Sequence, residues 1–91
     1  MKGESIKEKI ANLFELPKDV VLDLPRISII GNLELNIENH RGIIEYEQEI
    51  IRIRIQDGQV IISGKELIIE SLTKSEVGIK GYIKDVTFKC Y

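Results

Sequence analysis

The sequence is poor in the residues that build disulfides, helices and basic surfaces. Its 91 residues include one cysteine, one alanine, two prolines and no tryptophan. The lone Cys90 cannot form an internal disulfide, which fits a reducing compartment. The formal net charge of −2 argues against a strongly basic nucleic-acid-binding protein. At this length we expect residues 1–91 to form a single domain with one core.

Long apolar runs are also missing. The longest, such as residues 20–22, hold three residues, whereas a secretory signal needs about 7–15 and a membrane-spanning helix about 20. We therefore expect a soluble, cytoplasmic protein with no direct insertion into a membrane.

β-Branched residues dominate the rest of the composition. The chain has 18 isoleucines and five valines, and 16 of the isoleucines lie at or after Ile27. Branching at Cβ suits a pleated strand, while alanine, the best helix former, occurs once. The composition predicts a mainly β protein, with the β region over residues 27–91.

The N-terminal part predicts one amphipathic helix over residues 5–15. Ser5 and Glu8 match a capping box, and Pro17 ends the helix. One apolar stripe follows the helical spacing: Ile6, Ile10, Leu13 and Phe14. We expect this helix to cover the apolar face of a sheet, with a partner-binding helix as the alternative. Residues 17–26 form an ordered connection in this interpretation.

Short apolar segments separated by glycines predict eight strands after this connection. The expected ranges are 27–31, 33–38, 43–47, 50–56, 59–63, 67–72, 76–83 and 86–89. Residues 51–55 alternate isoleucine with arginine, as a half-buried strand does. Asp57-Gly58 predicts a tight hairpin in which Ile53 pairs with Ile62.

The expected architecture is an antiparallel β-sandwich or roll of about seven to eight short strands, with the helix packed on it. A weak repeat places a glycine at Gly31 and again at Gly64, each followed by an apolar run. The repeat leaves a short β-solenoid-like stack as the alternative. The predicted hairpin disfavours that alternative, because solenoid strands run parallel.

Residues that could carry chemistry are few. The single histidine lies in the turn motif Asn39, His40, Arg41 and Gly42, where asparagine and glycine suit turn geometry. His40 has no companions for a metal site and no partners for nucleophilic catalysis. The glycines are spaced singly, so no phosphate-binding loop is present. We therefore expect no enzyme activity, no metal and no cofactor.

A sheet edge without lysine or arginine is the feature that favours an interaction protein. Residues 27–38 contain no lysine or arginine after Arg26, so this segment lacks the charges that discourage strand addition. The candidate interaction surface comprises Ile27, Ile29, Leu33, Leu35 and Ile37. The expected occupant of this edge is another protein or a second copy of the chain. A small-ligand-binding, barrel-like module is the alternative.

Four stretches resemble the YabP/YqfC family of sporulation proteins. They are Leu-Pro-Lys-Asp-Val-Val-Leu-Asp-Leu-Pro-Arg at 16–26, Ile-Glu-Asn-His-Arg-Gly-Ile at 37–43, Gly-Lys-Glu-Leu-Ile-Ile at 64–69 and Gly-Tyr-Ile-Lys-Asp-Val at 81–86. The resemblance implies a cytoplasmic protein of the mother cell of a sporulating bacterium, with a part in spore coat or envelope assembly. It also implies partners among other sporulation proteins, one of them membrane-bound. It carries over no catalytic or cofactor-binding residue.

Overall fold

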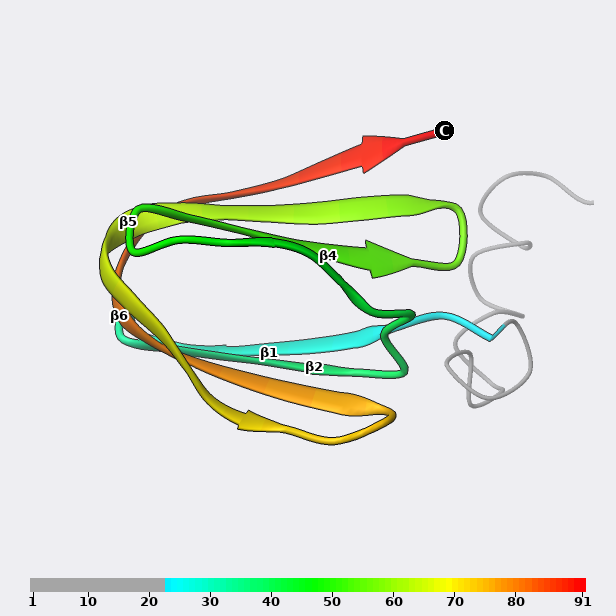
Figure 1. Cartoon of the computed structure of the whole chain (residues 1–91), viewed down its shortest axis with the longest axis horizontal. Helices are drawn as coiled ribbons and strands as arrows, with labels where there is room; N and C mark the ends of the chain where they lie inside the picture. Colours follow the sequence, from blue (N-terminus) through cyan, green and yellow to red (C-terminus); the bar gives the residue numbers. More distant parts are fainter. Residues whose placement is uncertain (1–22) are drawn as a thin grey trace, which may run out of the picture.

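In the computed structural model, residues 23–91 are described, and they form one antiparallel sheet of six strands (Figure 1). The strands are β1 (Arg26–Ile30), β2 (Glu34–Glu38), β3 (Ile43–Tyr46), β4 (Ile50–Ile55), β5 (Gly58–Leu72) and β6 (Glu76–Cys90). Their order in the sheet is β1-β2-β6-β5-β4-β3. The mainly β prediction is confirmed. The helix expected over 5–15 and most of the connection over 17–26 lie outside the described residues.

The prediction of seven to eight short strands was wrong. The segments 59–63 and 67–72 belong to one strand of 15 residues, β5, and the segments 76–83 and 86–89 belong to another, β6. The first gap contains Gly64, where β5 bends without ending. The second gap, Lys84-Asp85, contains no glycine and lies within β6. Every strand pair in the described part is antiparallel, which also rules out the solenoid-like stack.

The long β5–β6 hairpin bends midway, so the sheet folds over on itself into two facing layers (Figure 1). The first layer contains β3, β4, residues 58–65 of β5 and residues 82–90 of β6. The second layer contains β1, β2, residues 68–72 of β5 and residues 76–80 of β6. We call the folded side the bend and the opposite side, where both layers end in loops, the mouth.

The core lies between the two layers. Nine side chains are at most 1% exposed and come from both layers: Leu35, Ile37, Ile51, Ile53, Val60, Ile62, Leu67, Val77 and Ile79. Alternation along the strands directs these residues inward, since successive side chains of a strand point to opposite faces. Burying such aliphatic side chains contributes roughly 1.5–3 kcal/mol each. The isoleucine and valine content thus serves one shared interior.

Two backbone features make the bend. The pairing of β5 with β6 shifts register between Ser63 and Gly64 and again between Lys65 and Ile68, and such bulges bend a strand locally. Gly64 has no room for a side chain, because a Cβ there would lie 2.0 Å from the carbonyl oxygen of Tyr82. Gly81, on the facing strand, has a φ of 140°, which L side chains rarely adopt.

Neighbouring turns fasten the bend by backbone hydrogen bonds. In the β3–β4 turn, the carbonyls of Gln48 and Glu49 accept from the amides of Leu67 and Gly64, at 2.8 and 3.1 Å. The β1–β2 turn binds β6 in the same way: the carbonyls of Asn32 and Leu33 accept from the amides of Ile83 and Gly81, at 2.7 and 3.1 Å. Each long strand is therefore held at its bend by a turn from its own side of the sheet.

The β4–β5 hairpin forms where it was predicted but in a different register. Ile53 pairs with Val60 and Ile55 with Gly58, so the two loop residues are Gln56 and Asp57 and not Asp57 and Gly58. Gly58 is needed on the strand: a Cβ there would lie 2.2 Å from the carbonyl oxygen of Lys89 on β6. The observed register differs from the predicted one by two residues, so each residue stays on its predicted face. The isoleucines of β4 point inward as expected.

Candidate functional site

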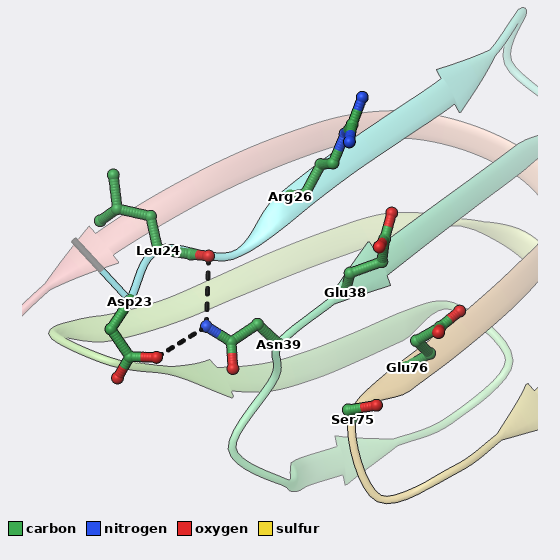
Figure 2. A pocket seen from close by; sticks show the side chains of 7 residues that line it. All are labelled: Asp23, Leu24, Arg26, Glu38, Asn39, Ser75 and Glu76. Carbon is green, nitrogen blue, oxygen red and sulfur yellow. Dashed lines mark hydrogen bonds between the residues drawn. The ribbon is translucent and has the colours of Figure 1, made fainter. Parts of the chain in front are cut away.

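A clasp of polar side chains closes one side of the mouth. The side-chain amide of Asn39 donates to the Asp23 carboxylate, at 2.9 Å, and to the carbonyl of Leu24, at 3.2 Å (Figure 2). The Arg41 guanidinium donates to the other oxygen of Asp23. We call Asp23, Asn39 and Arg41 the clasp. It joins two of the stretches that carried the family resemblance, 16–26 and 37–43.

His40 fastens the same loop to the β5–β6 turn. The ring is 7% exposed. Its Nδ1 accepts from the amide of Gly42 at 2.9 Å, and its Nε2 lies 3.0 Å from the carbonyl oxygen of Thr73. Since a carbonyl only accepts and a backbone amide only donates, these contacts suit the tautomer with its proton on Nε2. Both nitrogens are engaged, which leaves neither available to a metal ion or a substrate.

The backbone of the loop completes the connection between the layers. The amides of Asn39 and His40 donate to the carbonyl of Ser75, at 2.6 and 3.2 Å. On the first layer, Arg41 and Gly42 exchange hydrogen bonds with the backbone of Arg54, at 2.7 and 2.8 Å. Asn39 adopts a φ of 66°, a conformation that asparagine tolerates better than most residues. The turn motif therefore crosses from one layer to the other.

A shallow polar depression of about 380 Å³ lies beside the clasp (Figure 2). Its lining is Asp23, Leu24, Arg26, Glu38, Asn39, Ser75 and Glu76. Arg26, Glu38 and Glu76 lie in register across β1, β2 and β6, so both charge signs are present. Within residues 23–91, no three side chains of His, Cys, Asp or Glu form a group that could hold a metal ion.

A second, apolar groove of about 380 Å³ opens on the other side of the mouth. Its lining is Leu24, Pro25, Ile55, Gln56, Asp57, Phe88 and Cys90. Phe88 pairs with the core residue Val60 and thus belongs to the inward face, yet it is 57% exposed. The described residues leave this part of the inward face uncovered. We refer to it as the apolar groove.

The five residues of the predicted interaction surface do not share one surface. Leu35 and Ile37 are fully buried in the core, and Ile27 packs against it. Ile29 and Leu33 are 49% and 51% exposed. Placing Leu35 and Ile37 on a surface was wrong, because β2 is an inner strand with β1 on one side and β6 on the other. Of the two strands in this segment, only β1 is a sheet edge.

The two edges of the sheet, β1 and β3, differ in how they are protected. β3 has four residues and a register shift against β4 between Ile43 and Glu45. The hydroxyl of its Tyr46 also accepts from the amide of Ile69, at 3.0 Å. β1 pairs with β2 in regular register over five residues, and its only charged residue is Arg26. β1 is the less protected edge.

The outward arginines of β4 are engaged within the molecule. Arg52 donates to Glu45 at 2.7 Å and to the side-chain oxygen of Gln59 at 3.2 Å. The guanidinium of Arg54 lies 5.6 Å from the ring centroid of Tyr91. These contacts account for both arginines on the outer face.

The sequence alone could not predict two sets of contacts at the mouth, those of Thr73 and Ser75 and those of Asp23. Thr73 and Ser75 bind the loop through their carbonyls, a contact that any residue type could make, so no pattern marks them. Asp23 did carry a signal, since it lies in a motif that accompanies the Asn39 motif. That signal indicated shared family membership and not the contact between the two.

Comparison with known proteins identifies the family. The model of the YabP family matches residues 23–90. An uncharacterized protein, YqfC of Bacillus subtilis (strain 168), is 37% identical over 83 residues, which cover 91% of this chain and 89% of the relative. No solved structure matches. Among the described residues, no helix has the length and apolarity needed to cross a membrane. The resemblance noted in the sequence is confirmed, and the chain belongs to the YabP family.

Proposed function

We propose that this YabP-family protein is a non-catalytic interaction factor of endospore formation, which binds another sporulation protein by strand addition at β1. The observation that carries the proposal is the open edge: β1 has a strand partner on one side only among the described strands. The link to sporulation rests on the resemblance of the motifs at 16–26 and 37–43. Spore coat or envelope assembly in the mother-cell cytoplasm is the setting that this resemblance favours.

The chemistry of β1 suits a β-strand as the partner. Ile29 and Ile30 are exposed, and β-branched side chains favour strand pairing. In strand addition, backbone hydrogen bonds provide affinity and alternate side chains provide specificity. Lysine, proline or a bulge would discourage such pairing, and β1 has none of them. We propose the accompanying membrane-bound sporulation protein as the partner, with a second copy of this chain as the competing occupant.

The test is a pair of matched edge variants. Ile29→Lys puts a charge on β1, and Ile44→Lys puts one on the protected edge β3, where Ile44 is also exposed. We expect Ile29→Lys to reduce recovery of the membrane-bound partner in a pull-down by about tenfold, equivalent to ~1.4 kcal/mol, and Ile44→Lys to leave it unchanged.

Light scattering on the purified chain identifies the occupant. A monomer that loses its partner only with Ile29→Lys supports the proposal. A dimer broken by Ile29→Lys assigns the edge to self-association instead. A monomer that recovers no partner, or equal losses from both variants, contradicts strand addition at β1.

The apolar groove supports a second candidate, a small-ligand-binding module. Its volume of about 380 Å³ falls at the lower end of the range of roughly 300–1,000 Å³ for ligand pockets. The space between the layers is filled by the core, so the groove is the place where such a ligand would bind. Titration calorimetry with a medium-chain fatty acid and with a soluble glycan fragment tests this candidate, and no heat of binding from either would count against it.

A further inference from the structure

The apolar groove exposes part of the inward face, and we propose that the chain's own residues 5–15 dock there as an amphipathic helix. This inference is independent of the proposed partner at β1. It concerns a different surface, at the mouth, and a segment outside the described residues.

Within residues 23–91, no strand covers the groove, although it belongs to the inward face of the sheet. Phe88 and Ile55 both occupy inward-facing strand positions. Phe88 pairs with the core residue Val60, and Ile55 continues the inward series of Ile51 and Ile53. Phe88 is nevertheless more than half exposed. Covering such apolar area is favourable by about 25 cal/mol per Å², so the groove favours an apolar occupant.

The described chain begins beside this groove. Leu24 and Pro25 line it, and the clasp holds Asp23 through Asn39 and Arg41. Residues 16–22 lie between Asp23 and the predicted helix. Fully extended, seven residues span about 23–25 Å, and the tether starts beside the groove that Leu24 and Pro25 line. The clasp therefore sets the point from which the N-terminal segment departs.

The sequence of residues 5–15 complements the groove. Its apolar residues form a single stripe: Ile6, Ile10, Leu13 and Phe14. Eleven residues are too few for a stable free helix in water, so docking of the stripe is what would stabilise it. Grooves receive amphipathic helices through anchors with this i, i+4, i+7 spacing. A short tether gives an effective concentration near the millimolar range, which favours the chain's own segment over a second copy.

The chain's only cysteine makes the proposal testable, because Cys90 lines the groove and is exposed. In the full chain, Leu13→Cys and, separately, Phe14→Cys put a thiol on the stripe. Asn12→Cys is the control, with nearly the same tether length but on the opposite side of the predicted helix. Under mild oxidation with diamide, we expect an internal disulfide with Cys90 at least about tenfold faster from the stripe positions, since docking adds to the tether's effective concentration.

The readouts are non-reducing gel mobility and the intact mass of the single chain. Faster internal closure from either stripe position supports docking, even if the other variant folds poorly. Equal rates from Leu13→Cys, Phe14→Cys and Asn12→Cys overturn it, as a free tether would give that result. Disulfides between chains assign the groove to a second copy, and absence of any closure in variants with wild-type circular dichroism also overturns it. No partner protein is needed, so failure at β1 leaves this result unaffected.

Discussion

The bend and the mouth close the same folded sheet by different means. At the bend, four backbone amides donate to carbonyls of two turns, and glycines allow strands to approach. At the mouth, side chains make the closure: the clasp joins Asp23, just before β1, to the β2–β3 loop, and His40 joins that loop to the β5–β6 turn. The apolar groove remains open beside them.

This difference explains which residue types each end requires. A backbone hydrogen bond can be made by almost any residue, so the bend constrains only positions where a Cβ cannot fit or where φ is positive. A side-chain hydrogen bond needs its own donor and acceptor, so the mouth requires particular residues at 23, 39, 40 and 41. Of the four family motifs, those at 16–26 and 37–43 supply the side-chain contacts of the mouth, while those at 64–69 and 81–86 lie at the bend.

The largest expected effect comes from filling the bend. Gly64→Val would place side-chain atoms against the backbone of Tyr82, where even a Cβ would be 2.0 Å from the carbonyl oxygen. Relieving this clash would require β5 to separate from β6, and both layers contain these two strands. We expect a loss of about 4 kcal/mol or more in the free energy of unfolding, measured by urea denaturation.

Gly31→Ala is the matched control for that substitution. Gly31 lies in the β1–β2 turn with a φ of 54°, and a Cβ there would meet nothing within 4 Å. Its cost is confined to the left-handed conformation, about 1–2 kcal/mol. Equal losses from the two variants would show that close approach at Gly64 is not what the bend requires.

At the mouth, His40→Phe should have the next largest effect. Phenylalanine fills the site but leaves the carbonyl of Thr73 and the amide of Gly42 without their partner. An unsatisfied buried polar group costs about 1–3 kcal/mol, so we expect a loss of about 2–4 kcal/mol by thermal or urea unfolding. Lys74→Ala, on the exposed β5–β6 turn, should change stability little. An unchanged free energy of unfolding in His40→Phe would mean that water replaces both hydrogen bonds.

The clasp should contribute less, because it is exposed. A double-mutant cycle of Asp23→Asn and Arg41→Gln isolates the ion pair, whose side chains are 51% and 44% exposed. We expect a coupling of about 0.2–1 kcal/mol, as for other surface pairs, which decreases as salt screens the charges. A coupling that stays the same from low to 1 M salt would contradict an electrostatic contribution.

The smallest effect concerns Lys80, next to the bend. The hydrogen bond to Glu70, at 2.9 Å, and the charges of Glu70 and Glu34 raise the pKa of Lys80 above its usual 10.5. A raised pKa means that the stabilisation is complete below the unfolded-state pKa and is lost as the pH rises through the folded-state value. Lys80→Met should therefore match the wild type in melting temperature more closely at strongly alkaline pH than at pH 7. A gap that grows above pH 10.5 would contradict this assignment.

The sequence pattern predicted which side chains of the sheet face the core, but not where the strands bend. Alternation at residues 51–55 assigned Ile51 and Ile53 to the core correctly, because side-chain period follows directly from strand geometry. A glycine can end a strand or bend it, and only the pairing of β5 with β6 on both sides of Gly64 shows that the strand bends there. The hairpin register was missed for a related reason, since β6 takes Gly58 into its pairing.

For the candidate site, the sequence identified the loop but not its contacts. Asn39 and Gly42 were recognisable as turn residues, and His40 was expected in the same turn motif. Its burial against Thr73 depends on a pairing 33 residues away. Leu35 and Ile37 were misplaced because an edge strand and an inner strand share the same apolar alternation, and only strand order separates them.

Since β5 and β6 each run through both layers, neither layer is an autonomous unit. The hairpin can form from contacts close in sequence, and the remaining strands then add to its two sides: β4 and β3 to one, β2 and β1 to the other. We predict that the hairpin is the nucleus of folding, so that substitutions within it slow folding while those in β1 and β3 chiefly speed unfolding. The outermost strands would then be the last to join and the first to detach, and β1 is one of them.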